Sequence, residues 1–357
     1  MQKVIIDPST KIPYSLFYIK GLADVFGEEN LAFSAKYFRG LERKTESHSY
    51  DHYMAFVIMD GTEIRKIIID FRDKVSVKES AYNWCDLYAK VNFNRKLTER
   101  RFHKKMLSIA PGFGIKTWGF WKTLILCSIN FSRCHFSPIV PLKAHIMDYF
   151  IPYYRRSKIE NYSSNSQDTN KLKNSTGGKK YVFFISTLWD HENCLEGTNH
   201  LRKNYIEFCK LNQQVEFEGG LLAHPSHPQY AEFKEIIFST KYSIERYIEK
   251  TKLSAFVFNT PAVHNCHGWK LGEFLAMGKA IISTPLSNEL PEKLIHGKDI
   301  HIAANDAELV EAIQLLATND EYRKHLENGA KTYYSKYAEP QRVIKSIETT
   351  SCGRGPT

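Results

Sequence analysis

The segment from Asn259 to Pro285, NTPAVHNCHGWKLGEFLAMGKAIISTP, contains the residues of this 357-residue chain that are best suited to bind a charged ligand. Its pattern predicts a strand end, a polar loop, a helix and a second strand, in that order. The first turn of such a helix offers backbone N–H groups and the positive end of the helix dipole, which both suit a phosphate. Gly268 lets a ligand approach the backbone closely, and Lys270 adds a positive charge at the same end. The segment therefore predicts a phosphate site at a helix N-terminus.

Glu273 lies one turn beyond Lys270, near where a ribose attached to the phosphate would extend. A carboxylate can accept hydrogen bonds from both sugar hydroxyls. Each residue also has an ordinary structural interpretation. Glu273 and Lys270 could be solvated surface groups, and the histidines at 264 and 267 could serve only the loop. Trp269 could simply pack the helix against the sheet.

The run Leu271 to Ser283, LGEFLAMGKAIIS, resembles the donor-site segment of GT-B glycosyltransferases, whose pattern is roughly x-x-x-E-A-M-A-x-G-x-P-V-I. In that family the glutamate contacts the donor ribose, and the loop before it contacts the diphosphate and the sugar. The resemblance implies that Glu273 holds the ribose and that Lys270, with the backbone at His267 and Gly268, meets the diphosphate. It covers residues 180–340, whereas the first half resembles the family only in the arrangement of its elements.

The chain departs from this pattern at two positions. Many retaining members carry a second glutamate eight positions before the ribose glutamate, and here that position is Asn265. The usual proline after the glycine is Ala280. An asparagine could still bond a sugar hydroxyl, but the charge is absent, so retention and inversion both stay open.

A second donor element is expected in the loop Ser186 to Asn199, STLWDHENCLEGTN, and in the helix after it. The resemblance implies that basic residues near this place help to neutralise the diphosphate, and Arg202 or Lys203 could serve. Thr187 and Asn199 could form hydrogen bonds, although Asn199 is also a good helix N-cap. Residues 218–220, Glu-Gly-Gly, predict a turn near the nucleobase.

No DxD pair at a strand end is evident, so neither a metal ion nor any other cofactor is expected beside the nucleotide-sugar donor. The family instead places positive protein groups on the leaving diphosphate. An inverting reaction needs a base from the first domain, and Asp73 fits because it follows a predicted strand end. Asp60, His48 and His52 are rivals, and Asp73 could also be a turn former.

The chain length and the alternation of strands and helices predict two α/β domains, the second of them Rossmann-like. The resemblance implies the GT-B arrangement, in which two Rossmann-like domains face each other across a cleft. We expect an acceptor-side domain at 1–155, a linker at 156–180, a nucleotide-sugar domain at 181–340 and a tail at 341–357. The linker is rich in Ser, Asn, Lys and Gly and has few apolar residues. Crowded strand patterns between 53 and 71 could include a hairpin.

A formal charge of +10 favours anionic partners. The segment 95–131 joins a basic run, RKLTERRFHKK, to an apolar and aromatic one, which suits an anionic membrane surface. The alternative is that the aromatic part is core and the basic run a solvated face. No nucleic-acid-binding signature is present, so we expect no nucleic acid partner.

Seven scattered cysteines without a CxxC pair predict reduced thiols in a cytosolic protein. The N-terminus lacks the apolar core of a signal peptide, and the most apolar stretch, 118–131, is too short to span a bilayer. We therefore expect a cytoplasmic protein, peripheral at the inner face of the plasma membrane.

Together these features predict a metal-independent glycosyltransferase that moves a sugar from a nucleotide-sugar donor to a glycan or lipid-linked acceptor. By analogy with the family, surface polysaccharide is the expected product. Two alternatives stay open: a sugar-nucleotide epimerase on the same scaffold, and a degenerate glycosyltransferase that only binds.

Overall fold

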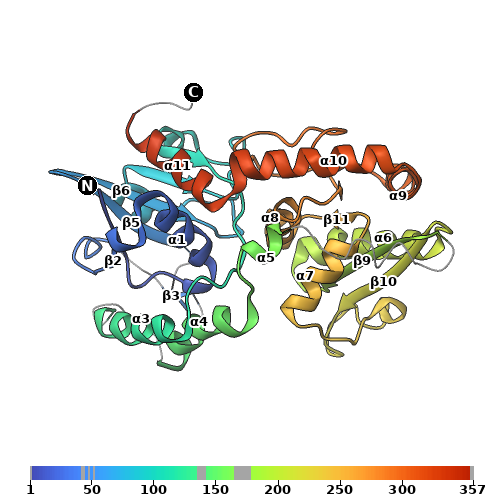
Figure 1. Cartoon of the computed structure of the whole chain (residues 1–357), viewed down its shortest axis with the longest axis horizontal. Helices are drawn as coiled ribbons and strands as arrows, with labels where there is room; N and C mark the ends of the chain where they lie inside the picture. Colours follow the sequence, from blue (N-terminus) through green and yellow to red (C-terminus); the bar gives the residue numbers. More distant parts are fainter. Residues whose placement is uncertain are drawn as a thin grey trace. The chain divides into compact units, whose positions relative to one another are not determined.

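The computed structural model describes residues 2–41, 45–46, 49–50, 53–134, 142–164 and 178–353, which form two compact α/β units (Figure 1). The first unit comprises Met1–Ile159, Glu289–Glu292 and Lys336–Thr357. The second comprises Glu160–Asn288 and Lys293–Ser335. The predicted α/β class with two units is confirmed. Much of the expected linker, 165–177, lies outside the described residues.

The first unit is built on a six-stranded mixed sheet. Its strands, in spatial order, are β2 (Leu31–Phe33), β1 (Lys3–Ile6), β5 (Tyr53–Asp60), β6 (Glu63–Asp70), β7 (Leu87–Lys90) and β8 (Met106–Ser108). Only β5 runs antiparallel to its neighbours, β1 and β6. β5 and β6 form the hairpin that the crowded pattern suggested, and Gly61 in its turn has a φ of 59°, which glycine adopts without strain. A separate short antiparallel pair is formed by β3 (Thr45–Glu46) and β4 (Ser49–Tyr50).

Seven helical segments complete the first unit. They are α1 (Ile12–Phe26), η1 (Glu28–Asn30), α2 (Glu79–Trp84), η2 (Arg100–Lys105), α3 (Phe120–Arg133), α4 (Leu142–Arg155) and α11 (Pro340–Ser351) within the described ranges. α1 buries Leu16, Ile19 and Leu22, which lie at helical spacing, and ends at Gly27.

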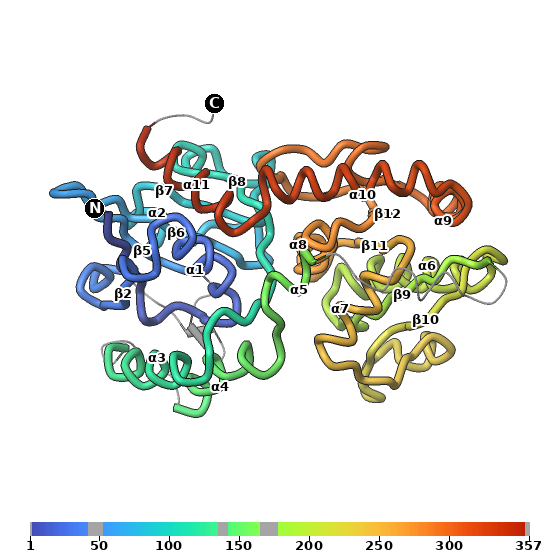
Figure 2. Tube along the Cα trace, in the orientation of Figure 1, coloured from blue at the N-terminus to red at the C-terminus, as the bar shows by residue number. Residues whose placement is uncertain are grey.

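Helix α11 returns the C-terminal end of the chain to the first unit, where it packs on α1 (Figure 2). The sequence predicted a tail at 341–357, but Pro340 begins a helix whose Ile344 and Ile347 are buried. Gly21 of α1 lies where the two helices meet, and a Cβ there would overlap with Pro340 O and the Ile344 side chain. Glycine therefore permits this close packing.

Among the described residues of the second unit, the named strands all pair in parallel. β9 (Lys180–Thr187) pairs with β10 (Val215–Leu222), and β11 (Val257–Asn259), β12 (Ile281–Ser283) and β13 (His301–Ile302) form a second group. The two groups meet where Ala255 N donates to Tyr181 O at 2.7 Å and Phe183 N donates to Ser254 Oγ at 2.9 Å. The spatial order is therefore β10-β9-β11-β12-β13. The strand order reverses between β9 and β11, and doubly wound sheets bind ligands beyond the strand ends at such a point.

Helical segments flank these strands along the chain. They are α5 (Glu160–Ser163), η4 (Cys194–Thr198), α6 (Asn199–Leu211), η5 (Lys234–Ile236), α7 (Ile244–Leu253), η6 (Val263–Asn265), α8 (Trp269–Ala276), α9 (Asp306–Thr318) and α10 (Asp320–Tyr333), followed by η7 (Tyr334–Ala338). Helix α7 begins only after Ser243, whose Oγ accepts from Arg246 N at 3.3 Å and so caps the helix.

The turn predicted at residues 218–220 is wrong, because these residues lie within β10. A side chain at Gly219 or Gly220 would overlap with the carbonyl oxygens of Phe184 and Ile236. The two glycines therefore allow close backbone approach within the sheet. Across the described ranges, no helix combines the length and hydropathy that crossing a bilayer requires.

Candidate functional site

The carboxyl ends of β9 and β11 carry the polar groups of the candidate site. β9 ends at Thr187, and β11 is followed by Thr260 and Pro261. Three helical segments, α6, η6 and α8, follow these strand ends along the chain. The site therefore lies at the point where the strand order of the second unit reverses.

Arg202 of α6 is buried and joins the two strand ends. Its Nε donates to Thr260 Oγ1 at 3.0 Å, Nη1 to Thr187 O at 2.9 Å and Nη2 to Pro261 O at 3.3 Å. All three acceptors are neutral. Burial lowers the pKa of the Arg202 guanidinium to about 10, so it remains positive at neutral pH.

Lys270 occupies the first turn of α8 and is only partly exposed. Its ammonium donates to Ile185 O and lies 5.0 Å from the centroid of the Phe184 ring. Burial, together with the nearby charge of Arg202, lowers the pKa of Lys270 to about 8, and Glu273 partly opposes this shift. Lys270 is therefore a second cation held mainly by neutral groups.

Gly268 is the N-cap of α8 and cannot cap the helix with a side chain. A Cβ at this position would meet only Ala262 Cβ, at 3.6 Å, so the backbone here is open to a neighbouring group. The positive end of the α8 dipole thus lies beside the Lys270 charge.

Glu273 lies one turn beyond Lys270 and is buried. Its Oε2 accepts a hydrogen bond from Tyr247 Oη at 3.0 Å, and burial together with this carboxylate raises the pKa of Tyr247 well above its usual value. Glu273 is therefore not the solvated surface group that the sequence left possible. The site therefore combines two cations, Arg202 and Lys270, with one carboxylate, Glu273, at a helix N-terminus. This combination suits an anion that also carries hydroxyl groups.

The other predicted site residues are placed as follows. Thr187 contributes its carbonyl oxygen to Arg202, and His267 is buried with Nε2 3.1 Å from Asn288 O. Asn265 is exposed and has a φ of 56°. Lys203 pairs with Glu207 instead, so Arg202 is the basic residue of α6 that reaches the strand ends.

Asn193 is a residue of this region that the sequence did not single out. Its Nδ2 donates to Ala262 O at 3.0 Å and to Asn265 Oδ1 at 3.2 Å, and its Oδ1 accepts from His264 N at 3.0 Å. His264 and Asn265 both have positive φ, of 58° and 56°, which non-glycine residues seldom adopt. Asn193 therefore holds a strained loop directly before α8.

The N-cap role predicted for Asn199 is wrong, because η4 continues directly into α6 and gives Asn199 helical dihedral angles. Its Nδ2 instead donates to Trp189 O and to Gln229 Oε1, both at 2.8 Å. Asn199 thus fixes the loop after β9.

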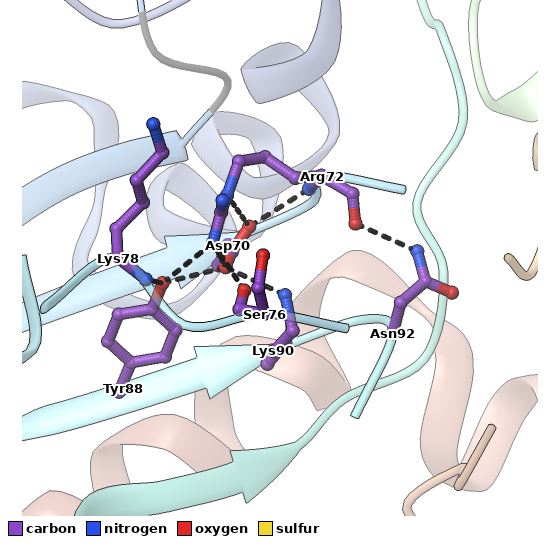
Figure 3. A network of polar contacts seen from close by, with 7 residues as sticks. All are labelled: Asp70, Arg72, Ser76, Lys78, Tyr88, Lys90 and Asn92. Atoms are coloured by element: carbon purple, nitrogen blue, oxygen red, sulfur yellow. Dashed lines mark hydrogen bonds and ion pairs between the residues drawn. The ribbon is translucent and has the colours of Figure 1, made fainter. Parts of the chain in front are cut away.

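A second polar cluster occurs in the first unit, at the carboxyl ends of β6 and β7 (Figure 3). Asp70 is fully buried and accepts from Arg72 Nη2 at 2.7 Å, Tyr88 Oη at 2.7 Å and Lys90 Nζ at 2.8 Å. Burial alone would raise the pKa of Asp70, but Lys90 and Arg72 outweigh it and hold this pKa well below its usual range. Asn92 donates to Arg72 O at 3.0 Å.

Asp73, the predicted base, is exposed in the loop just after this cluster. Asp60 ends β5 and accepts from Gln2 Nε2 at 2.9 Å. The remaining rivals, His48 and His52, lie outside the described residues. The base therefore stays a prediction. Among the residues that the structure describes, no three His, Cys, Asp or Glu side chains gather to hold a metal ion.

No family model and no curated protein match this chain. Among solved structures, S. aureus MnaA in complex with UDP is similar at 13% identity and a TM-score of 0.48, over 99% of this chain and 98% of that one. HepE of Anabaena, also with UDP, has 13% identity and a TM-score of 0.46, over 77% of this chain. The chain spans 66% of the length of HepE. The C-terminal domain of a group 1 family glycosyl transferase, LpcC of Francisella tularensis, has 13% identity and a TM-score of 0.36, over 48% of this chain and 92% of that domain. TM-scores below 0.5 do not decide an architecture, so the fold rests on the topology of this chain.

Proposed function

We propose that this protein is a glycosyltransferase whose second unit binds a nucleotide-sugar donor. The observation that carries the proposal is the pair of cations Arg202 and Lys270, held on neutral acceptors at the point of strand reversal. Placing two such charges in a dry environment is costly unless an anion compensates them. Glu273, one turn from Lys270, suits the hydroxyls of a ribose.

The chemistry follows from the charges. When the bond between the anomeric carbon and the diphosphate oxygen breaks, negative charge develops on the departing diphosphate. Arg202, Lys270 and the N-terminus of α8 meet that charge with groups already in position, which lowers the barrier. The acceptor hydroxyl forms the new bond and loses its proton to a base, for which Asp73 remains our candidate.

We also propose that transfer needs no metal ion, because protein cations take the place that a divalent cation would fill. Transfer that continues in excess chelator would agree with this. Loss of transfer in chelator, restored by a divalent cation, would refute it.

The acceptor is proposed to be a glycan or a lipid-linked sugar, with surface polysaccharide as the product. Retention and inversion both stay open, because Asn265 occupies the position at which many retaining GT-B members carry a second glutamate. The cytoplasmic location remains a prediction.

The donor site is tested by a thermal-shift screen against UDP-, GDP-, CMP- and dTDP-sugars, with wild type beside Glu273→Ala and Lys270→Ala. A ligand about a hundredfold above its dissociation constant stabilises by ~2.7 kcal/mol. We expect a shift with one nucleotide class, weakened in both variants and kept in Lys203→Ala, the matched control. No shift with any of the four would refute the donor site.

Incubation with the identified donor then separates the alternatives. A glycosyltransferase releases the nucleoside diphosphate and forms a glycosylated acceptor. An epimerase converts the donor sugar in the absence of acceptor. A protein that binds the donor but changes nothing would be a degenerate member.

A further inference from the structure

Helix α3 exposes a stripe of apolar residues and buries the polar side chains of Thr123 and Asn130. Thr123, Cys127 and Asn130 are buried, at the spacing of one helix face. Trp121, Ile125 and Ile129 form the outward face and are 72%, 55% and 38% exposed. A surface helix normally buries its apolar stripe and exposes its polar one.

The inward polar groups of α3 are fixed by specific bonds. Asn130 Nδ2 donates to Tyr149 Oη at 2.8 Å, and Thr123 Oγ1 donates to Gly119 O at 2.9 Å. His145 Nε2 lies 2.9 Å from Cys127 O. Rotating α3 to bury its apolar stripe would break the first and third of these contacts, so the orientation belongs to the folded state.

Helix α4 extends the same surface. It packs beside α3 (Figures 1 and 2), and its Leu142, Ile146 and Met147 are 53%, 42% and 45% exposed. We call these three residues and Trp121, Ile125 and Ile129 the α3–α4 face. Exposed apolar residues that gather on two adjacent helices mark a surface that binds something.

Aromatic residues border the α3–α4 face at one end. Phe120 of α3 lies 6.0 Å from Phe150 and 5.9 Å from Tyr153 of α4, measured between ring centroids. Lys116 Nζ lies 3.8 Å from the centroid of the Tyr153 ring. Tyrosine and tryptophan are suited to a boundary that is apolar on one side and wet on the other.

The charges of α3, α4 and their flanking residues are mostly positive, although Lys122 of α3 pairs with Glu28 of η1. Residues 116–158 contain seven basic residues and one acidic residue, Asp148, which pairs with Lys11 at 2.8 Å. Among the basic residues, Arg133, Lys143 and Arg155 are exposed. A second copy of the chain on this face would bring the same positive charges together, whereas anionic headgroups complement them.

We propose that the α3–α4 face docks on an anionic lipid membrane, with its apolar side chains in the headgroup and acyl boundary and its exposed cations at the phosphates. This inference goes beyond glycosyl transfer and does not rest on it.

The docking surface proposed here keeps α3 from the segment 95–131 that the sequence suggested, but not the basic run of that segment. Within the basic run, Arg101 pairs with Glu79 and Glu99, both at 2.8 Å, and Lys105 donates to the carbonyls of Tyr82 and Cys85. The strand that follows this run, β8, is drawn at the upper edge of the first unit in Figure 2, whereas α3 and α4 lie at its lower edge. The cations that border the apolar residues come from 116–158 instead.

The test is flotation of the full chain with vesicles of phosphatidylcholine, alone or mixed with phosphatidylglycerol. We expect binding to the mixed vesicles only. The variant Trp121→Ser/Ile125→Ser and the variant Lys143→Glu/Arg155→Glu should each lose about tenfold or more in vesicle affinity. A matched control is Leu97→Ser, which changes an apolar residue that is 71% exposed and lies between β7 and η2, outside α3 and α4.

Further measurements exclude misfolding, a damaged donor site and dimer formation as causes of a change in vesicle binding. Circular dichroism and nucleotide-sugar thermal shifts of each variant should equal those of wild type, so a loss of vesicle binding would not reflect misfolding or a failed donor site. Light scattering reports the oligomeric state. No binding to either vesicle, equal binding of all variants, or a wild-type dimer that the Trp121→Ser/Ile125→Ser variant dissociates would each overturn the proposal.

Discussion

Replacing Lys270 with methionine should stabilise the unliganded protein while weakening its binding of a nucleoside diphosphate. The Lys270 ammonium exchanges water for the carbonyl of Ile185 and for the faces of Phe184 and Tyr247. Methionine keeps the ring contacts without a charge. The pKa of Lys270 falls from 10.5 to about 8. At ~1.4 kcal/mol per pKa unit this corresponds to at most ~3 kcal/mol, and to ~1–2 kcal/mol after allowance for solvent screening.

The pH dependence of this effect has a definite sign. Below pH 8, Lys270 is protonated in both the folded and the unfolded protein, so the folded state bears the full cost. Between pH 8 and pH 10.5 the folded protein releases the proton first, and the cost shrinks. Urea denaturation should therefore show a larger difference in the free energy of unfolding between Lys270→Met and wild type near pH 7 than at about pH 9.5.

The same substitution removes one cation from the expected diphosphate. A charged hydrogen bond contributes ~2 kcal/mol, so affinity for the donor should fall about 30-fold. At a concentration about a hundredfold above the wild-type dissociation constant, stabilisation by the ligand should fall from ~2.7 to ~0.9 kcal/mol. Lys203→Met, a neighbouring cation change on α6, should leave both quantities unchanged.

Three outcomes would refute this reasoning. If Lys270→Met is less stable than wild type at pH 7, then the charge of Lys270 does not destabilise the folded protein. A stability difference independent of pH would show that the pKa of Lys270 is not lowered. Undiminished stabilisation by the ligand would remove Lys270 from the donor site.

The remaining predictions concern other parts of the molecule. Asp70→Asn should lower the free energy of unfolding by ~3–5 kcal/mol, because it leaves two buried cations uncompensated, and the wild type should lose the same stability as the pH falls below the usual aspartate range. Asp73→Asn should change stability by less than ~0.5 kcal/mol yet abolish transfer, and normal transfer would exclude Asp73 as the base. Arg202→Met should cost ~2–4 kcal/mol in urea denaturation, since it leaves three acceptors unpaired, and a neutral result would contradict the observed bonding. Gly21→Ala should weaken the packing of α11 on α1, and limited proteolysis within residues 340–351 that is no faster than in wild type would count against it.

The features that could be predicted from the sequence are those that lie within one short segment of the chain. The strand, loop and helix that carry Lys270 and Glu273 are contiguous, so their order and the helix N-terminus follow from residues within one short segment. Arg202 could be identified only as one of two neighbouring basic residues. To choose Arg202 over Lys203, one must know which face of α6 points toward the ends of β9 and β11. That orientation is set by tertiary packing.

Features that depend on tertiary pairing could not be read from the sequence. Asp70 and Lys90 meet because β6 and β7 pair in parallel, with these two residues in register. Asn193 meets Asn265 across 72 positions of the chain. The apolar residues of α3 were visible in the sequence, but which face of the helix turns outward depends on the buried bonds of Asn130.

The central claim is that the diphosphate of a nucleotide sugar binds where the strand order of the second unit reverses. Hydrogen–deuterium exchange of the full chain, with and without the best-stabilising sugar of the four nucleotide classes, locates the ligand directly. We predict slower exchange at residues 185–193 and 262–273, with weaker protection of both segments in Lys270→Ala at the same ligand concentration. Protection confined to the first unit, or the absence of protection in these two segments, would contradict the claim.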